Sequence, residues 1–176
     1  MSKTTTPEQN KALVLKAFDT LFNRRDYDAA ERFWSDRYIQ HSAHIAPGRD
    51  GLFNLVRAQP DTLKYENQLI VAEGDYVIAH GRFSGHGRPA AWIAADIVRM
   101  EDGKLAEHWD VLQDEARKAE SVSGVPMFGN RFPGEPEAGP TAAANAMPVI
   151  ADHPATSRAL AASALPQRDP GLMRSG

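Results

Sequence analysis

The segment from Asp96 to Asp110, DIVRMEDGKLAEHWD, constrains the fold more than any other part of this chain. Two apolar-rich runs flank Asp102-Gly103, and an Asp-Gly pair in that setting is typical of the tight turn of a β-hairpin. Because side chains alternate between the two faces of a strand, the register of the hairpin decides which polar residues share a face. The segment therefore predicts two antiparallel strands whose alignment depends on the length of the turn.

Two turn lengths are compatible with the segment, and they place its acidic residues differently. A two-residue loop would set Asp96 opposite Trp109 and would put Asp96 and Asp110 on different faces. A three-residue loop, residues 101–103, with its glycine left-handed in a bulge, sets Asp96 opposite His108. We favour this second register, in which Asp96, His108 and Asp110 share one face. The same face also carries apolar residues: Trp92, Ala94, Val98, Ala106 and Leu112.

Two carboxyl groups and one imidazole among apolar side chains suit proton transfer. Burial disfavours an ionised carboxyl group and a second carboxylate nearby disfavours it further, so we expect pKa values shifted toward neutrality. A solvated sheet face would explain His108 and Asp110 alone, but Trp92 and the other apolar residues beside them argue against simple solvation. This face is therefore the candidate site.

The opposite face of the same hairpin is also largely apolar, with Ile93, Ile97, Leu105, Trp109 and Val111. A sheet that is apolar on both faces needs a cover on each side. Helices can cover one side, and a second copy of the chain or the C-terminal segment can cover the other. We predict a homodimer through this face.

Helix signals precede the strand signals along the chain. Residues 6–9 (TPEQ) provide an N-cap and a proline at the first helical position, Asp26 can cap a second short helix, and a third helix is expected around residues 50–58. Strand-like runs at residues 69–72 and 76–83 then precede the hairpin. This order predicts an α+β fold with three N-terminal helices packed on one face of a curved, mainly antiparallel sheet.

Composition divides the chain near residue 132. Every Phe, Tyr and Trp lies at or before Phe132, and seven of the twelve prolines follow it. We therefore expect one domain, residues 1–132, and a Pro/Ala-rich tail, residues 133–176.

Charge and composition also exclude several classes of function. The net charge of -3 provides no electrostatic footprint for nucleic acid or an anionic membrane, and the absence of cysteine excludes thiolate chemistry. No apolar segment opens the chain and no run approaches transmembrane length. A cytoplasmic protein is the resulting expectation.

The remaining histidines are weaker candidates. His41 follows a short predicted strand and could project into the same cavity, whereas His44 and His86 lie in Pro/Gly-rich surroundings typical of the surface. His41, His108 and Asp110 could form a metal site of two histidines and one carboxylate, but no HExxH or similarly close spacing supports it. We therefore predict no metal and no cofactor.

Several strings of the sequence resemble one family. They are YIQH at residues 38–41, GRDG at 48–51, VAEGDYV at 71–77, DIVRMEDGKLAEHWDV at 96–111 and SVSGVPMFGNRF at 121–132. Over roughly residues 8–132 they resemble the SnoaL-like polyketide cyclase group of the NTF2-like superfamily. The last string is also similar to bacterial SnoaL-like proteins labelled as aldol-condensation enzymes. The resemblance implies a cone-shaped α+β fold.

The resemblance also implies roles for the candidate residues. Asp110 matches an aspartate on the last strand that acts as acid and base in the cofactor-independent aldol closure of these cyclases. One strand earlier, Asp96 stands where those cyclases have histidine, so His108 would supply the imidazole from the same strand as Asp110. In the resulting hypothesis Asp110 removes a proton α to a carbonyl, and His108 or a neutral Asp96 donates a hydrogen bond to the enolate oxygen.

The expected function is a cofactor-independent lyase or isomerase, of the aldol-condensation or cyclase type, that acts on a small or medium apolar carbonyl compound. The residues expected to bind this compound are Tyr38, His41, Trp92, Val98 and Leu112. Two other functions stay open: a non-catalytic dimeric module that binds a small ligand, and a hydrolase that activates water in the same pocket, with or without a metal.

Overall fold

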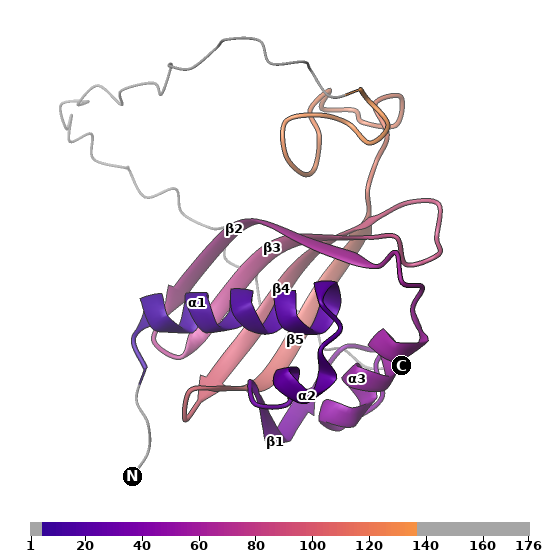
Figure 1. Ribbon diagram of the computed structural model, residues 1–176. Helices are drawn as coiled ribbons and strands as arrows, with labels where there is room; N and C mark the ends of the chain where they lie inside the picture. The colour runs from indigo at the N-terminus through magenta and orange to yellow at the C-terminus, as the bar shows by residue number, and fades with distance from the viewer. Residues whose placement is uncertain (1–4, 137–176) are drawn as a thin grey trace, which may run out of the picture. The chain divides into compact units, whose positions relative to one another are not determined.

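The three predicted helices are confirmed, and the first two begin where the sequence provides caps. This computed structural model describes residues 5–136 (Figure 1). A capping box begins α1 (Pro7–Phe18). The side chain of Thr6 accepts a hydrogen bond from the N–H of Gln9, and the Gln9 side chain accepts one from the N–H of Thr6. The side chain of Asp26 accepts from the third residue of α2 (Tyr27–Ala30). The third helix is α3 (Gly48–Ala58). A π-helical turn that the sequence does not predict, η1 (Asp19–Asn23), continues α1.

Five strands form one mixed sheet. They are β1 (Trp34–Gln40), β2 (Lys64–Glu73), β3 (Tyr76–Ser84), β4 (Trp92–Glu101) and β5 (Lys104–Asp114). Their order across the sheet is β1-β5-β4-β3-β2. The meander from β2 to β5 is antiparallel, and only β1, at the edge, pairs in parallel with its neighbour β5. The predicted α+β fold with a mainly antiparallel sheet is confirmed.

The register of the β4–β5 hairpin differs from the predicted one. Glu101 pairs with Lys104, so the loop has two residues, and both have positive φ angles (54° and 74°), as a type I′ turn requires. The three-residue loop is therefore wrong. A bulge lies further along β5, because Arg99 pairs with Glu107 while Met100 pairs with Leu105.

This bulge decides which residues share a face. A two-residue loop alone would put Asp96 and Asp110 on different faces of the hairpin. The bulge adds one residue to β5 and shifts the pairing by one, so Asp96, His108 and Asp110 lie on the same face, as predicted. The cross-strand partner of Asp96 is Asp110 and not His108, which pairs with Val98. The bulge also turns Leu105 into the core, where it is 1% exposed, so its predicted place on the outer face is wrong.

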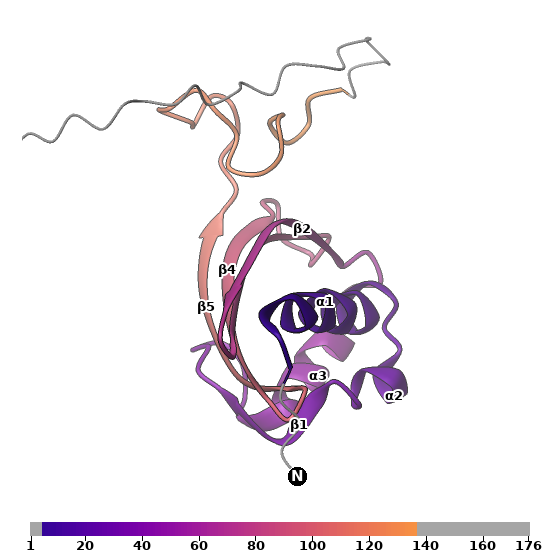
Figure 2. The same cartoon turned by 90° about the vertical axis from the view of Figure 1, so that its left-hand side faces the viewer.

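The helices lie on the concave side of the curved sheet (Figure 2). α1 packs against β2 and β3, and α3 packs against β1. The largest fully buried side chains of this core are Trp34, Phe53, Leu21, Met100, Leu105, Val14, Val56, Val77 and Val98. α1 is also tied to the β2–β3 turn by Asn10, whose side-chain amide donates to the carbonyl oxygen of Gly74 at 3.1 Å.

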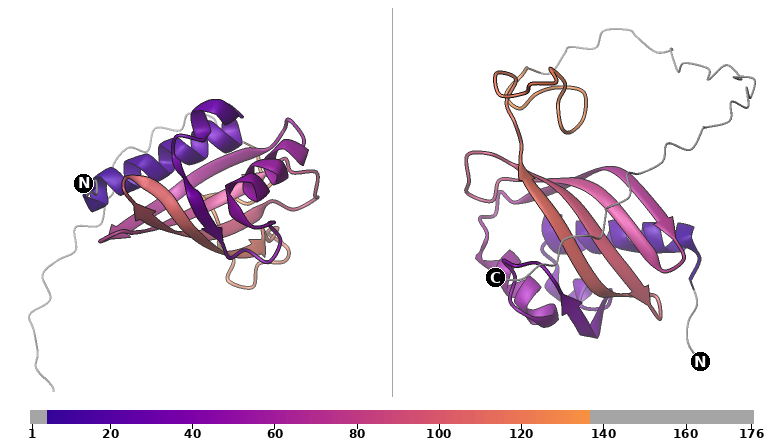
Figure 3. Two further views of the ribbon diagram at one scale, coloured as in Figure 1. Left: turned by 90° about the horizontal axis from the view of Figure 1, so that it is seen from below. Right: turned by 180° about the vertical axis from the view of Figure 1, so that it is seen from behind.

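No helix among residues 5–136 covers the convex face of the sheet (Figure 3, right). Its exposed apolar residues, here called the convex patch, are Ile39, Leu69, Val71, Tyr76, Ile78 and Val111. Of the other residues predicted for this face, Ile93 is buried, and Ile97 and Trp109 are half-buried.

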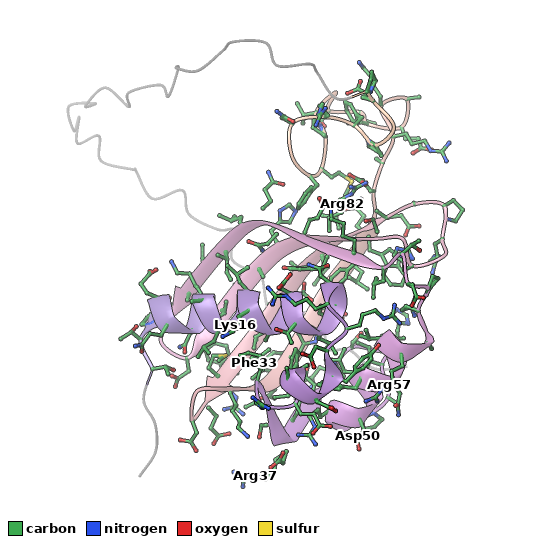
Figure 4. All side chains as sticks on the ribbon, viewed as in Figure 1. Lys16, Phe33, Arg37, Asp50, Arg57 and Arg82 are labelled. Carbon is green, nitrogen blue, oxygen red and sulfur yellow. The ribbon has the colours of Figure 1, made fainter. Side chains whose placement is uncertain are left out.

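Residues 115–136 follow β5 without forming a helix or strand. Arg82 of β3, labelled in Figure 4, ties this segment to the sheet. Its Nε lies 2.8 Å from Glu115 Oε2. The Gly129 N–H donates to Gln68 Oε1 at 2.9 Å. The predicted tail, residues 133–176, lies outside the described residues from position 137 onward. Among the described residues, no helix combines the length and apolar character that crossing a membrane requires.

Candidate active site

A cavity lies between the helices and the concave face of the sheet. Its volume is about 110 Å³. Its walls are mainly apolar and come from every helix except α2: Phe18, Phe22, Leu52, Leu55 and Val56, together with Tyr38, Ile45, Leu63, Phe83, Trp92 and Leu112. The polar residues that line it are Ser42, His44, Gln59, His86, Asp96, His108 and Asp110.

Asp96 and His108 form a buried hydrogen-bonded pair in this cavity. They extend from the neighbouring strands β4 and β5 and are 3% and 7% exposed. His108 Nε2 lies 3.0 Å from Asp96 Oδ1, and the other ring nitrogen, Nδ1, lies 3.0 Å from Oε1 of Gln40. Gln40 ends β1, and the parallel pairing of β1 with β5 sets it beside His108. Three strands therefore hold the imidazole in place.

The hydrogen bonds of Gln40 assign the protons on His108. Oε1 of Gln40 accepts from the N–H of Ser42 at 2.9 Å, which identifies this atom as the amide oxygen. Nδ1 of His108 must then carry a proton, because an amide oxygen only accepts. The bond between Nε2 and Asp96 Oδ1 contains one further proton, which belongs to either partner. While Oδ2 of Asp96 is unprotonated, the pair is thus either a neutral imidazole with a carboxylic acid or an imidazolium with a carboxylate.

Burial raises the pKa of Asp96 above its ordinary value of 3.8, because it removes the carboxylate from water. The nearby Asp110 raises the pKa further, and the hydrogen bond and charge of His108 oppose the shift. The second carboxyl oxygen of Asp96, Oδ2, is buried and has no hydrogen-bond partner among the described residues. An unsatisfied buried oxygen is unfavourable, so Oδ2 is available to a bound ligand or water.

Asp110 lies directly opposite Asp96 in the β4–β5 ladder and lines the same cavity. Side chains that face each other across two strands have Cβ atoms about 4.5–5.5 Å apart. Asp110 is only half-buried, so the two carboxyl groups differ in their contact with solvent. The structure thus brings together the three residues predicted to be catalytic, in an apolar cavity.

Some of the residues predicted to bind substrate line the cavity, and others do not. Tyr38, Trp92 and Leu112 line the cavity. Burial raises the pKa of Tyr38, so its hydroxyl stays protonated there. Val98 lies on the predicted face but belongs to the closed core, where it is 0% exposed, and it does not line the cavity.

His41 does not reach the cavity. Side chains alternate along β1, and because Gln40 points inward, His41 points to the convex side. There its ring stacks on Trp109 with centroids 4.7 Å apart, and its Nε2 lies 2.8 Å from Glu107 Oε1. The metal site considered from His41, His108 and Asp110 is therefore not assembled. Among residues 5–136, no group of three or more His, Asp or Glu side chains is arranged to hold a metal ion.

Two polar residues that shape the site were not predicted: Gln40, which holds His108, and His86, which lines the cavity. Gln40 lies two residues after Tyr38 on the same strand, and this alternation could have identified it. His86 was expected at the surface but is only 7% exposed, and its ring stacks on Trp92 with centroids 4.1 Å apart. The glycines on both sides of His86 are the signal that could have drawn attention to it.

Comparisons with known proteins agree with this architecture. The model of the SnoaL-like domain family matches residues 14–108. Among solved structures, a candidate ketosteroid isomerase from Kribbella flavida is 19% identical, covers 72% of this chain and 96% of its own, and has a TM-score of 0.58. An NTF2-like protein of unknown function from Burkholderia xenovorans is 20% identical, with 65% and 94% covered and a TM-score of 0.53.

A candidate polyketide cyclase from Acidithiobacillus ferrooxidans is 17% identical, with 60% of this chain and 88% of its own covered and a TM-score of 0.51. At such identities these structures establish the NTF2-like fold alone. No protein with a curated description matches the sequence.

Proposed function

This chain belongs to the SnoaL-like domain family, and from that premise we propose that it is an acid/base enzyme acting on an apolar carbonyl compound, without a cofactor. The observation that carries the proposal is the buried pair of Asp96 and His108, with a free carboxyl oxygen in an apolar cavity and Asp110 directly opposite. Two carboxyl groups in unequal surroundings suit an acid and a base in one reaction.

In the proposed reaction Asp110 is the base. Its carboxylate removes a proton from the carbon next to the carbonyl group, and the electrons of that C–H bond become the enolate. Asp96, held in its acid form by burial, donates from Oδ2 to the carbonyl oxygen as negative charge develops there. Asp110 then returns its proton to another carbon of the substrate, or the enolate carbon attacks a second carbonyl group, whose oxygen takes the proton from Asp110. These outcomes correspond to an isomerase and to an aldol-type enzyme.

His108 acts through Asp96 in this scheme. Gln40 and Asp96 occupy both of its ring nitrogens, so neither nitrogen is free to meet the substrate. For Oδ2 to donate, the pair carries one proton more than in either form described above: both ring nitrogens of His108 are protonated, Oδ1 of Asp96 accepts from Nε2, and the acid proton of Asp96 is on Oδ2. Of the two donors considered for the enolate oxygen, Asp96 is therefore better supported, and His108 is a positioning residue.

The proposal is tested by proton exchange, which needs no knowledge of the natural substrate. An apolar ketone such as 2-acetylnaphthalene is incubated with the protein in D₂O, and deuterium entering the carbon next to the carbonyl is followed by NMR. Wild-type protein should accelerate this exchange over buffer. Asp110→Asn keeps the shape of the side chain but removes the base, so the acceleration should fall roughly a hundredfold or more.

Asp75→Asn is the matched control, because Asp75 is exposed in the β2–β3 turn and does not line the cavity. It should exchange at the wild-type rate. Should Asp110→Asn exchange as fast as wild type, Asp110 is not the base. Tight binding of the ketone without any exchange by the wild-type protein would instead favour a non-catalytic binding module.

A further inference from the structure

The loop between β3 and β4 is built to turn His86 inward. Gly85 and Gly87 flank it with φ angles of 69° and 83°, which side-chain-bearing residues rarely adopt. A Cβ atom on Gly85 would lie 1.9 Å from the carbonyl oxygen of Thr62, so only glycine fits there. The Thr62 hydroxyl donates to the Gly85 carbonyl oxygen at 2.7 Å and fixes the loop. The position of the His86 side chain therefore follows from the backbone around it.

The His86 ring is buried, yet it is not satisfied. It lies nearly parallel to the indole of Trp92, at an interplanar angle of 20°, and it lines the cavity. Neither ring nitrogen forms a well-aligned hydrogen bond among the described residues, although the backbone carbonyl groups of Phe83 and of His86 itself lie near the ring. Leaving buried polar atoms unpaired is unfavourable, and native proteins rarely do so without a functional reason. A ligand in the cavity can supply the missing partner.

The chemistry of this partner follows from the state of the ring. Burial lowers the pKa of His86, and the nearby positive charge of Arg88 adds to the effect, so the neutral imidazole is favoured. A neutral imidazole has one donor nitrogen and one acceptor nitrogen. A hydroxyl group both donates and accepts and matches it, whereas a carboxylate only accepts.

His86 and Asp96 lie at different places in the same cavity. The stacking partner of His86, Trp92, precedes Asp96 by four residues on β4, and both side chains face the cavity. Four residues of a strand span roughly 13 Å. A ligand that contacts both sites is therefore elongated, and the apolar walls require an apolar body between its polar ends.

We propose that His86 is a specificity-determining residue that hydrogen-bonds a hydroxyl group at the end of an elongated apolar carbonyl compound remote from the reacting carbonyl. This inference rests on the proposed function for the orientation of the ligand, with its carbonyl group at Asp96. It narrows the substrate class from apolar carbonyl compounds in general to those with a distant hydroxyl group.

Two fluorescent ketones test the proposal by binding alone. In 6-hydroxy-2-acetylnaphthalene a hydroxyl group lies across the ring system from the acetyl group, and 2-acetylnaphthalene lacks it. Wild-type protein should bind the hydroxylated ketone about tenfold more tightly, the size of one well-formed hydrogen bond. His86→Phe keeps a ring against Trp92 but removes both nitrogens, so this preference should vanish while 2-acetylnaphthalene binds as before.

Two further variants test whether the preference for the hydroxylated ketone depends on the polar atoms of residue 86. His86→Gln retains a donor and an acceptor and should recover part of the preference. His80→Phe is the matched control, because His80 lies beside Phe128 and does not line the cavity, and it should keep the full preference. The proposal is overturned if wild type shows no preference, if His86→Phe keeps it, or if neither ketone binds.

The binding preference for the hydroxylated ketone does not depend on catalysis. Asp110→Asn should still prefer the hydroxylated ketone, because this variant leaves His86 and Trp92 unchanged. A wild-type protein that shows the preference but exchanges no deuterium would contradict the proposed function and leave the role of His86 intact.

Discussion

Replacing Asp96 with asparagine should make the protein less sensitive to alkaline conditions. Asp96 is 3% exposed, and burial raises the pKa of its carboxyl group above the ordinary value of 3.8. The folded state therefore binds a proton more tightly than the unfolded state does. The resulting stabilisation is fully present below pH 3.8 and is lost as the pH rises toward the folded-state pKa.

The size of the effect follows from linkage. Between the unfolded and folded pKa values, the free energy of unfolding should fall by up to ~1.4 kcal/mol for each pH unit, because one additional proton is bound by the folded state. Asp96→Asn has no proton to lose and removes this contribution. Its amide group also fits the site, because an N–H can donate to His108 Nε2 while the amide oxygen replaces Oδ2.

Urea denaturation from about pH 4 to about pH 9 measures the difference. The wild-type curve should fall with rising pH relative to that of Asp96→Asn, and the variant should be the more stable protein at the alkaline end. Asp75→Asn, a change of the same kind at an exposed turn, should follow the wild type. Parallel curves for wild type and Asp96→Asn would refute the reasoning, because Asp96 would then have the same pKa in both states.

Two further predictions concern stability and assembly. Arg25 donates to the carbonyl oxygens of Val56, Gln59 and Pro60 at the end of α3. Arg25→Lys should therefore lower the free energy of unfolding by about 2 kcal/mol, because lysine cannot make all of these hydrogen bonds. Arg24→Lys, at an exposed site, should leave this free energy unchanged. Equal urea midpoints would contradict this. We also propose a homodimer through the convex patch, so light scattering should give a dimer mass that Val111→Lys lowers. A wild-type monomer at micromolar concentration would refute it.

Interactions between residues that are close in the sequence were sufficient to predict much of the fold. Caps at Thr6 and Asp26 and the turn at Asp102-Gly103 act between residues close in the sequence, so the first two helices and the hairpin could be predicted from their neighbours alone. The alternation of side chains along β5 likewise placed His108 and Asp110 on one face, whatever the turn. The family motifs then identified the SnoaL-like fold before any tertiary contact was known.

The register of the hairpin depended on distant residues. Leu105 donates its N–H to the carbonyl oxygen of Phe33 at 2.8 Å and pairs with Trp34 of β1, some seventy residues earlier in the chain. These contacts accompany the bulge that turns Leu105 into the core and sets Asp96 opposite Asp110. A turn motif reports only on the residues beside it, so the bulge that the motif predicts in the loop lies in the strand instead.

Tertiary structure also decided whether His41 and His86 lie at the site, for the same reason. His41 points outward because β1 pairs with β5 in a register that brings Gln40 to His108. His86 is buried because Thr62 holds its loop and Trp92 lies beneath its ring. Which side of a sheet a residue faces, and whether a loop residue is buried, depend on the segment that packs against it. The sequence determines the chemical groups and their local spacing, whereas packing between segments far apart in the chain determines which of those groups meet.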